Sequence, residues 1–181
     1  MKNKEFIEKL VKQLNSQIAE VESWNNIDEK TLSIKPNEKK WNALECIEHL
    51  NFYGEYYVPT LRKVLKEVSK DSVAEFESSM LGGYFAKRMH PVDGAKPMKT
   101  LKETNSLNRS VNIEVINKFV EQQKGLAKII EDSVNVNLKK TKASISFAKF
   151  IKLNIGDTFS VLVNHNERHI QQAKRAMSLK Q

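Results

Sequence analysis

The segment WNALECIEHL, residues 41–50, marks the start of a long amphipathic helix. Asn42 followed by Glu45 has the spacing of an N-cap residue and a carboxylate that reaches back to it. Beyond this start, apolar side chains recur at gaps of three and four residues, which indicates one buried helical face: Cys46, Leu50, Tyr53, Tyr57, Leu61, Val64 and Val68. The pattern predicts a helix over about residues 42–69.

Pro59 lies inside this predicted helix. A proline in a helix removes one backbone hydrogen bond and favours a bend. The sequence therefore predicts a kinked helix rather than a straight one, and two shorter helices that break near Val58 are the alternative.

Three further segments carry the same helical period of apolar residues: about 2–24, 111–132 and 157–178. None of them is apolar enough to span a bilayer, and polar connections separate them. Four long amphipathic helices in one chain predict an all-α four-helix bundle. With 181 residues, we expect a single domain over residues 1–181.

The segment over residues 70–109 carries no sustained period and contains several glycines and prolines. We expect a long irregular crossover between the second and third helices that covers something or crosses the end of the bundle. No alternation in the chain is strong enough to predict a strand. FAKFIKL, residues 147–153, is interpreted as one or two helical turns, and the preceding NVNLKKTKAS as a linker.

Composition narrows the classes of function. The net charge is +8, but the lysines are scattered and no nucleic-acid motif is present, so a solvated basic surface is favoured over specific nucleic-acid binding. One cysteine, Cys46, excludes an internal disulfide framework and a zinc site built on several thiolates. The charged start MKNKEFIEKL does not resemble a secretory signal, so a soluble cytoplasmic protein without a membrane partner is expected.

NHNERHI, residues 164–170, places His165 and His169 one turn apart on the same side of the last helix. Such a pair can chelate a divalent ion. Glu167, two residues after the first histidine, points to the opposite side, which excludes the H-E-x-x-H arrangement of metalloproteases. Taken alone, the pair fits a structural role as well as a metal site.

His49 supplies a third candidate ligand, at the edge of the apolar face of the second helix. Bundles gather metal ligands from facing helices, and three protein ligands leave coordination positions open for water or substrate. Cys46, one turn earlier, is a candidate fourth ligand or nucleophile, although an inert buried cysteine is the more common outcome. His90, within KRMHPVD, is interpreted as a loop residue.

WNALECIEHL (41–50) resembles the W-[ST]-x-x-E-x-x-x-H-L segment of the DinB-like superfamily, which includes the YfiT-type metal-dependent hydrolases. NHNERHIQQAKR (164–175) is similar to the closing H-x-x-x-H-x-x-Q segment of that superfamily. Asn42 stands where the superfamily often has serine or threonine, and it remains a capping residue.

The resemblance implies an up-down-down-up four-helix bundle, often a homodimer. It implies a metal triad of His49, His165 and His169 that binds a divalent ion, zinc or nickel first and manganese next. It further implies an enzyme acting on small molecules: a thiol S-transferase that uses a low-molecular-weight thiol such as bacillithiol or mycothiol, or a hydrolase or isomerase. A non-catalytic metal-binding or dimerising bundle is the alternative, and a basic anion-binding protein is a third hypothesis.

Polar residues near the expected triad are candidates for supporting contacts: Glu45, Tyr53, Tyr56, Asn166 and Gln172. Glu45 is equally explained by the helix start, and Tyr53 by the core. Arg168 is interpreted as a surface or interhelix residue, with a clamp for an anionic thiol as the alternative.

Overall fold

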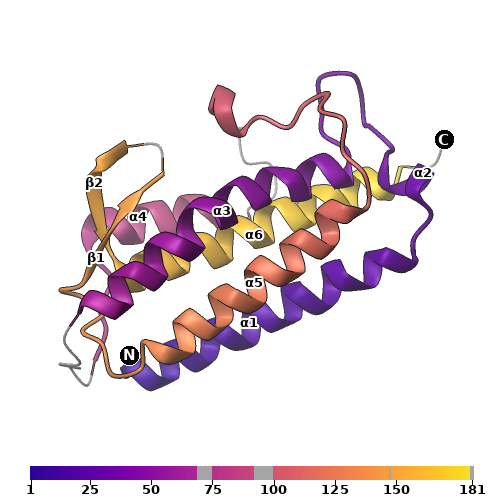
Figure 1. Ribbon diagram of the computed structural model, residues 1–181. Helices are drawn as coiled ribbons and strands as arrows, with labels where there is room; N and C mark the ends of the chain where they lie inside the picture. The colour runs from indigo at the N-terminus through magenta and orange to yellow at the C-terminus, as the bar shows by residue number, and fades with distance from the viewer. Residues whose placement is uncertain (69–74, 92–99, 147, 180–181) are drawn as a thin grey trace.

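The computed structural model describes residues 1–68, 75–91, 100–146 and 148–179, and it is dominated by four long helices (Figure 1). These are α1 (Asn3–Ser23), α3 (Ala43–Glu67), α5 (Glu114–Asp132) and α6 (Ile155–Met177). Helix α5 packs between α1 and α3, and α6 packs against α3 and α1. Helices α1 and α6 run in one direction and α3 and α5 in the other, which confirms the predicted up-down-down-up four-helix bundle (Figure 1).

Helix α3 begins with the capping box that its sequence predicts. The Glu45 amide donates to the Asn42 Oδ1 at 2.8 Å, and the Asn42 amide donates to the Glu45 Oε2 at 3.0 Å. The helix continues through Pro59, so the alternative of two shorter helices is wrong. Beside the proline, the Thr60 hydroxyl donates to the Tyr56 carbonyl at 2.7 Å.

The four apolar helix faces meet in one core. Each long helix buries the side chains spaced three and four residues apart in its sequence, which stabilises the bundle by removing apolar surface from water. The largest fully buried side chains include Leu14, Leu50, Phe119 and Phe159, one from each helix.

The crossover is more ordered than its sequence predicts. It contains α4 (Met80–Met89) and the short 3-10 helix η2 (Lys102–Thr104), so the expectation of an irregular 70–109 segment is corrected for the residues that the structure describes. The Ser79 side chain caps α4 by accepting from the Gly82 amide at 3.0 Å. Helix α4 packs on α6. Shorter pieces, η1 (Trp24–Asn26) and α2 (Glu29–Leu32), join α1 to α3.

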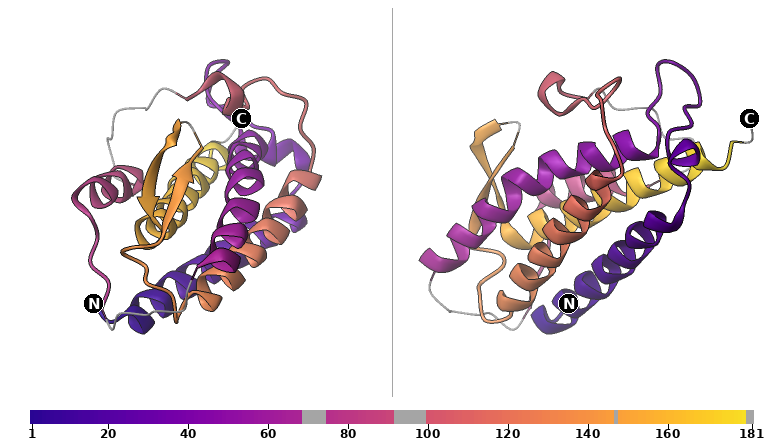
Figure 2. Two further views of the ribbon diagram at one scale, coloured as in Figure 1. Left: turned by 60° about the vertical axis from the view of Figure 1, so that its left-hand side comes forward. Right: turned by 45° about the vertical axis from the view of Figure 1, so that its right-hand side comes forward.

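A two-stranded antiparallel hairpin replaces the expected linker and helical turns. Strand β1 (Lys142–Ile145) pairs with β2 (Ala148–Asn154), with Ala143 opposite Leu153. A strand forms here because pairing satisfies its backbone hydrogen bonds, and that pairing is tertiary information which local periodicity does not carry. The hairpin and α4 lie on the outer side of α3 and α6, away from α1 and α5 (Figure 2).

Candidate metal centre

The bundle brings together the three histidines that the sequence singles out. His49 lies in the second turn of α3, and His165 and His169 project from the facing side of α6. One ring nitrogen from each of the three lies within 4.8 Å of the others. The Nε2 atoms of His49 and His165 are 3.3 Å apart.

A hydrogen bond at Nδ1 orients two of the three imidazoles. The Nδ1 of His49 lies 2.7 Å from the Thr104 carbonyl oxygen, and the Nδ1 of His169 lies 3.1 Å from the Gln172 Oε1. Because these oxygens only accept hydrogen bonds, each Nδ1 carries the proton. Nε2 is therefore the nitrogen with the free lone pair in both His49 and His169, as in metal-ligating histidines whose other nitrogen donates a hydrogen bond.

Burial keeps the cluster neutral. Burial lowers the pKa of His49 to about 4. The hydrogen bond to the Thr104 carbonyl opposes part of this decrease. The pKa values of His165 and His169 fall well below their ordinary value, first through burial and then through the neighbouring imidazoles and Arg168. Neutral imidazole is the form that binds a metal ion, so the three candidate ligands need not lose protons near neutral pH.

The distances in the cluster suit a divalent ion. Two nitrogens that each lie about 2.0–2.1 Å from a tetrahedral zinc ion are roughly 3.3–3.4 Å apart. The 3.3 Å separation between the His49 and His165 Nε2 atoms equals this value. Without an ion, the same contact is a hydrogen bond from the His165 Nε2 to the His49 Nε2, so the separation alone fits both states.

A cavity of about 640 Å³ opens onto the histidines. Trp41 forms part of its wall, with its ring centroid 4.7 Å from that of His49 and 5.6 Å from that of His169. Tyr53 lies on another side, 4.4 Å from the His165 ring, and burial raises the pKa of its hydroxyl. Tyr53 therefore remains a hydrogen-bond donor at neutral pH. The volume is sufficient for a small organic ligand beside the histidines.

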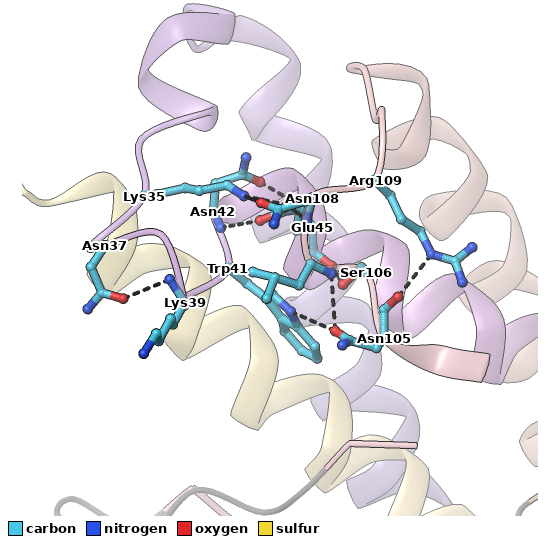
Figure 3. A network of polar contacts seen from close by, with 11 residues as sticks. Lys35, Asn37, Lys39, Trp41, Asn42, Glu45, Asn105, Ser106, Asn108 and Arg109 are labelled. Carbon is cyan, nitrogen blue, oxygen red and sulfur yellow. Dashed lines mark hydrogen bonds and ion pairs between the residues drawn. The ribbon is translucent and has the colours of Figure 1, made fainter. Parts of the chain in front are cut away.

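A polar network around Glu45 holds the end of the crossover against α3 (Figure 3). The buried Glu45 carboxylate accepts from the Lys35 Nζ at 2.8 Å and from the Asn108 amide at 2.6 Å. Its backbone carbonyl accepts from the Ser106 hydroxyl at 2.6 Å. These contacts fix the segment that carries the Thr104 carbonyl, so Glu45 supports the orientation of His49 from a distance.

Two other candidate residues lie outside the cluster. Cys46 is fully buried, and burial raises the pKa of its thiol, which makes it an inert core residue rather than a ligand or nucleophile. His90 is exposed and contacts the Pro91 carbonyl through its Nδ1 at 2.9 Å, as expected for a loop residue.

Three polar side chains near the triad in sequence face other elements. Tyr56 contacts the Ser144 hydroxyl of the hairpin at 2.9 Å. The Asn166 amide donates to Gln123 of α5 at 2.8 Å. Glu167 accepts from Gln17 of α1 at 3.0 Å, which confirms that it points away from the histidines. Of the supporting candidates, only Gln172 and Tyr53 contact the triad.

Several residues of the site were not predicted from the sequence. The Thr104 contact is made by a backbone carbonyl, which leaves no trace in residue type. Arg88 belongs to α4, a segment that the sequence predicts to be irregular, and its carbonyl accepts from the Arg168 Nη1 at 3.3 Å. The position of Trp41 was predictable, because a large aromatic residue directly before a capped helix start is expected to pack on the next turn.

A family comparison agrees with the fold. A family model described as the DinB superfamily matches residues 9–173 of the chain. Comparison with curated proteins and with solved structures gave no match. In the part of the chain that the structure describes, no helix is long and apolar enough to cross a membrane.

Proposed function

This chain belongs to the DinB superfamily, and from that membership and its histidine cluster we propose that it is a divalent-metal-dependent enzyme acting on small molecules. His49, His165 and His169 are the proposed metal ligands. The observation that carries the proposal is the convergence of three buried, neutral imidazoles, two of them oriented by a second contact, at the end of an open cavity.

Some residues would hold the ion, and others would contact a ligand in the cavity. When bound, a divalent ion lowers the pKa of a thiol or water that it coordinates. Thr104 and Gln172 hold the ring protons of His49 and His169 at Nδ1. The Tyr53 hydroxyl keeps its proton and can donate to a ligand in the cavity, and the Trp41 ring limits the access of water to the cluster.

The donor set guides the choice of ion. Imidazole ligands suit zinc and nickel, whereas manganese prefers oxygen ligands. Within the described residues, no carboxylate joins the three histidines. We therefore propose zinc or nickel as the resident ion, with manganese as a weaker alternative.

The proposed reaction is transfer of a low-molecular-weight thiol or hydrolysis. In the transfer, the thiolate sulfur forms a bond to an electrophilic carbon while the bond from that carbon to its leaving group breaks. Metal-loaded protein incubated with a panel of small thiols and a generic electrophile measures transfer, and the same electrophile without thiol measures hydrolysis.

Metal content and thermal unfolding test the proposal. Protein purified without a metal-affinity column is expected to contain about one divalent ion per chain. Added zinc or nickel should raise the Tm of metal-free protein, since a ligand at about 100 times its Kd stabilises by roughly 2.7 kcal/mol. The H165N variant should lose this response, and H90N, altered at an exposed histidine, should keep it. No ion and no rise in Tm would overturn the proposal.

The second candidate function is a non-catalytic metal-binding or dimerising module. The contact between His49 and His165 is compatible with it, because these two side chains can hydrogen-bond to each other without a catalytic ligand. Bound metal without turnover of any thiol or electrophile in the panel is the result expected of such a module.

A further inference from the structure

The cavity over the histidines has an uneven charge. Among its described lining residues, four are lysine or arginine and none is aspartate or glutamate. Two of the cations, Lys39 and Lys40, precede α3, Arg88 belongs to α4 and Arg168 to α6. Three separate parts of the chain thus bring positive charge to one concave surface.

These four cations have no acidic partners in the described chain. The ion pairs formed by its lysines involve other residues. The Arg168 guanidinium donates to the Arg88 carbonyl, not to a carboxylate. Arg88 and Arg168 thus lie close together at the cavity, and an anion there would compensate the repulsion between their charges.

The excess of positive charge is a property of this cavity and does not follow from the net charge of +8. A second hollow, over α3 and α5, is lined by Glu48, Glu114 and Glu121 around one lysine, Lys118. Of these two hollows, the one beside the histidine cluster has basic residues as its charged lining, and the other has mainly acidic ones.

Much of the rest of the cavity wall is apolar. Trp41, Met89, Leu101 and Leu107 all line it. A free inorganic anion would leave these side chains without contacts. A small organic anion would bury its apolar part against them and present its charge to the arginines, whose planar guanidinium groups bind carboxylate and phosphate oxygens in pairs.

We propose that the cavity binds a small organic anion whose carboxylate or phosphate contacts Arg88 and Arg168 while its other end faces the histidine cluster. This inference rests on the proposed function and extends it, since it states the class of substrate that the same cavity would bind. The two arginines would select the ligand by charge and position it, and the histidines would hold the reacting end.

The two tryptophans of the chain provide a local readout. The Trp41 indole N–H lies in the cavity wall and donates to Asn105 at 3.2 Å, whereas the Trp24 indole N–H donates to Glu20 at 3.3 Å. Metal-free, nitrogen-15-labelled protein is titrated with phenylacetate, phenyl phosphate and the neutral phenylacetamide. The two indole signals are followed by NMR, and W41F assigns them.

We expect the anions to shift the Trp41 signal and leave the Trp24 signal unchanged. Their Kd should be about ten-fold lower than that of phenylacetamide, the scale of one good charge-assisted contact. Tighter binding of the phosphate probe would point to a phosphate ester as the natural ligand, and tighter binding of phenylacetate to a carboxylate. The preference for anions should fall with added salt.

Two double variants make the result specific. R88Q/R168Q should bind all three probes with similar affinity, while R62Q/K63Q, which loses the same charge from the exposed surface of α3, should keep the preference. Equal binding of the amide and the anions, no binding of any probe, or a preference that survives in R88Q/R168Q would overturn the inference. Because the protein is metal-free, these results are independent of the metal measurement that tests the proposed function.

Discussion

At the scale of single residues, the contact between His169 and Gln172 is one by which a neutral side chain can orient a proposed metal ligand. The glutamine follows by three positions on α6, so the helix itself places its oxygen beside the histidine Nδ1. Such contacts fix the ring orientation and raise ligand basicity.

Replacement of Gln172 by alanine is expected to lower zinc affinity by about 10- to 100-fold, because His169 loses the acceptor that orients its ring. Competition with a chromophoric chelator measures the change. Q171A is the matched control, since the neighbouring Gln171 donates to Glu167 outside the cluster. Equal affinity in Q172A and the unaltered protein would contradict the prediction.

The buried histidines also predict how metal-free protein responds to acid. Their pKa values are lower in the folded state than the ordinary value of 6.5, so below that pH the unfolded chain binds more protons. Above about pH 6.5 these histidines are neutral in both states, so they should not reduce the free energy of unfolding. The free energy of unfolding should then decrease as the pH falls toward 4, by about 1.4 kcal/mol per pH unit for each histidine that is protonated only in the unfolded chain.

Urea unfolding of metal-free protein at several pH values measures this slope. H49Q should flatten it, because the variant removes one of the histidines whose pKa is lowered in the folded state, whereas H90Q should leave it unchanged. An identical slope in H49Q would assign the acid response to groups outside the cluster.

Helical spacing predicted that His165 and His169 share one side of a helix and that His49 lies at the edge of an apolar face. The grouping of all three as a metal triad came from the resemblance to the DinB-like superfamily. Their supporting contacts were predictable only in part. Gln172 lies on the same helix as its partner, so its spacing was informative. Thr104 acts through its backbone, at a point set by the tertiary path of the crossover, and residue type carries no record of that path.

At the scale of elements, the docking of α4 on α6 depends on a close approach. The Asp157 carboxylate accepts from the Ser79 amide at 3.0 Å and from its hydroxyl at 2.7 Å. A Cβ atom at Gly82 would overlap this carboxylate, whereas one at Gly83 would make an ordinary contact with Ser78. The adjacent glycines thus have different roles.

G82A is expected to destabilise the protein by about 1–3 kcal/mol through this overlap. G83A should stabilise it by up to about 1 kcal/mol, since alanine favours the helix. Urea unfolding measures both changes, and hydrogen exchange over residues 80–89 shows whether α4 is the element released. Equal effects of the two substitutions would contradict the close approach.

Long elements with a strong period were predicted correctly, and short ones were not. Helices α1, α3, α5 and α6 begin and end within a few residues of their predicted limits. Helix α4 contains two glycines and depends on Ser79 and Asp157, and β2 depends on its pairing with β1. Both form through contacts with distant parts of the chain, which a local pattern does not contain.

At the scale of the whole molecule, the order of the helices sets the position of the site. Because α3 and α5 are parallel neighbours, the chain must return along the bundle between them, and this return places α4 against α6 and η2 against α3 (Figure 1). The cavity wall is therefore a consequence of topology.

The homodimer expected from the resemblance stays a prediction. Sedimentation velocity should find a species of twice the chain mass of 20.8 kDa. The exposed Met80 and Phe150, on α4 and β2, are the first positions to change to serine if the dimer is found, since large exposed apolar side chains favour association. A single species of chain mass at all concentrations would contradict the prediction.

The contact between His49 and His165 joins positions 116 residues apart. An ion shared by them would close a loop of that length, and loop closure in a flexible chain is slow and entropically unfavourable, by roughly 4.7 kcal/mol for a cross-link spanning about 100 residues. Such a contact is expected to form late in folding. The ion should then act mainly by slowing unfolding, so the metal-loaded protein would gain lifetime more than it gains folding speed.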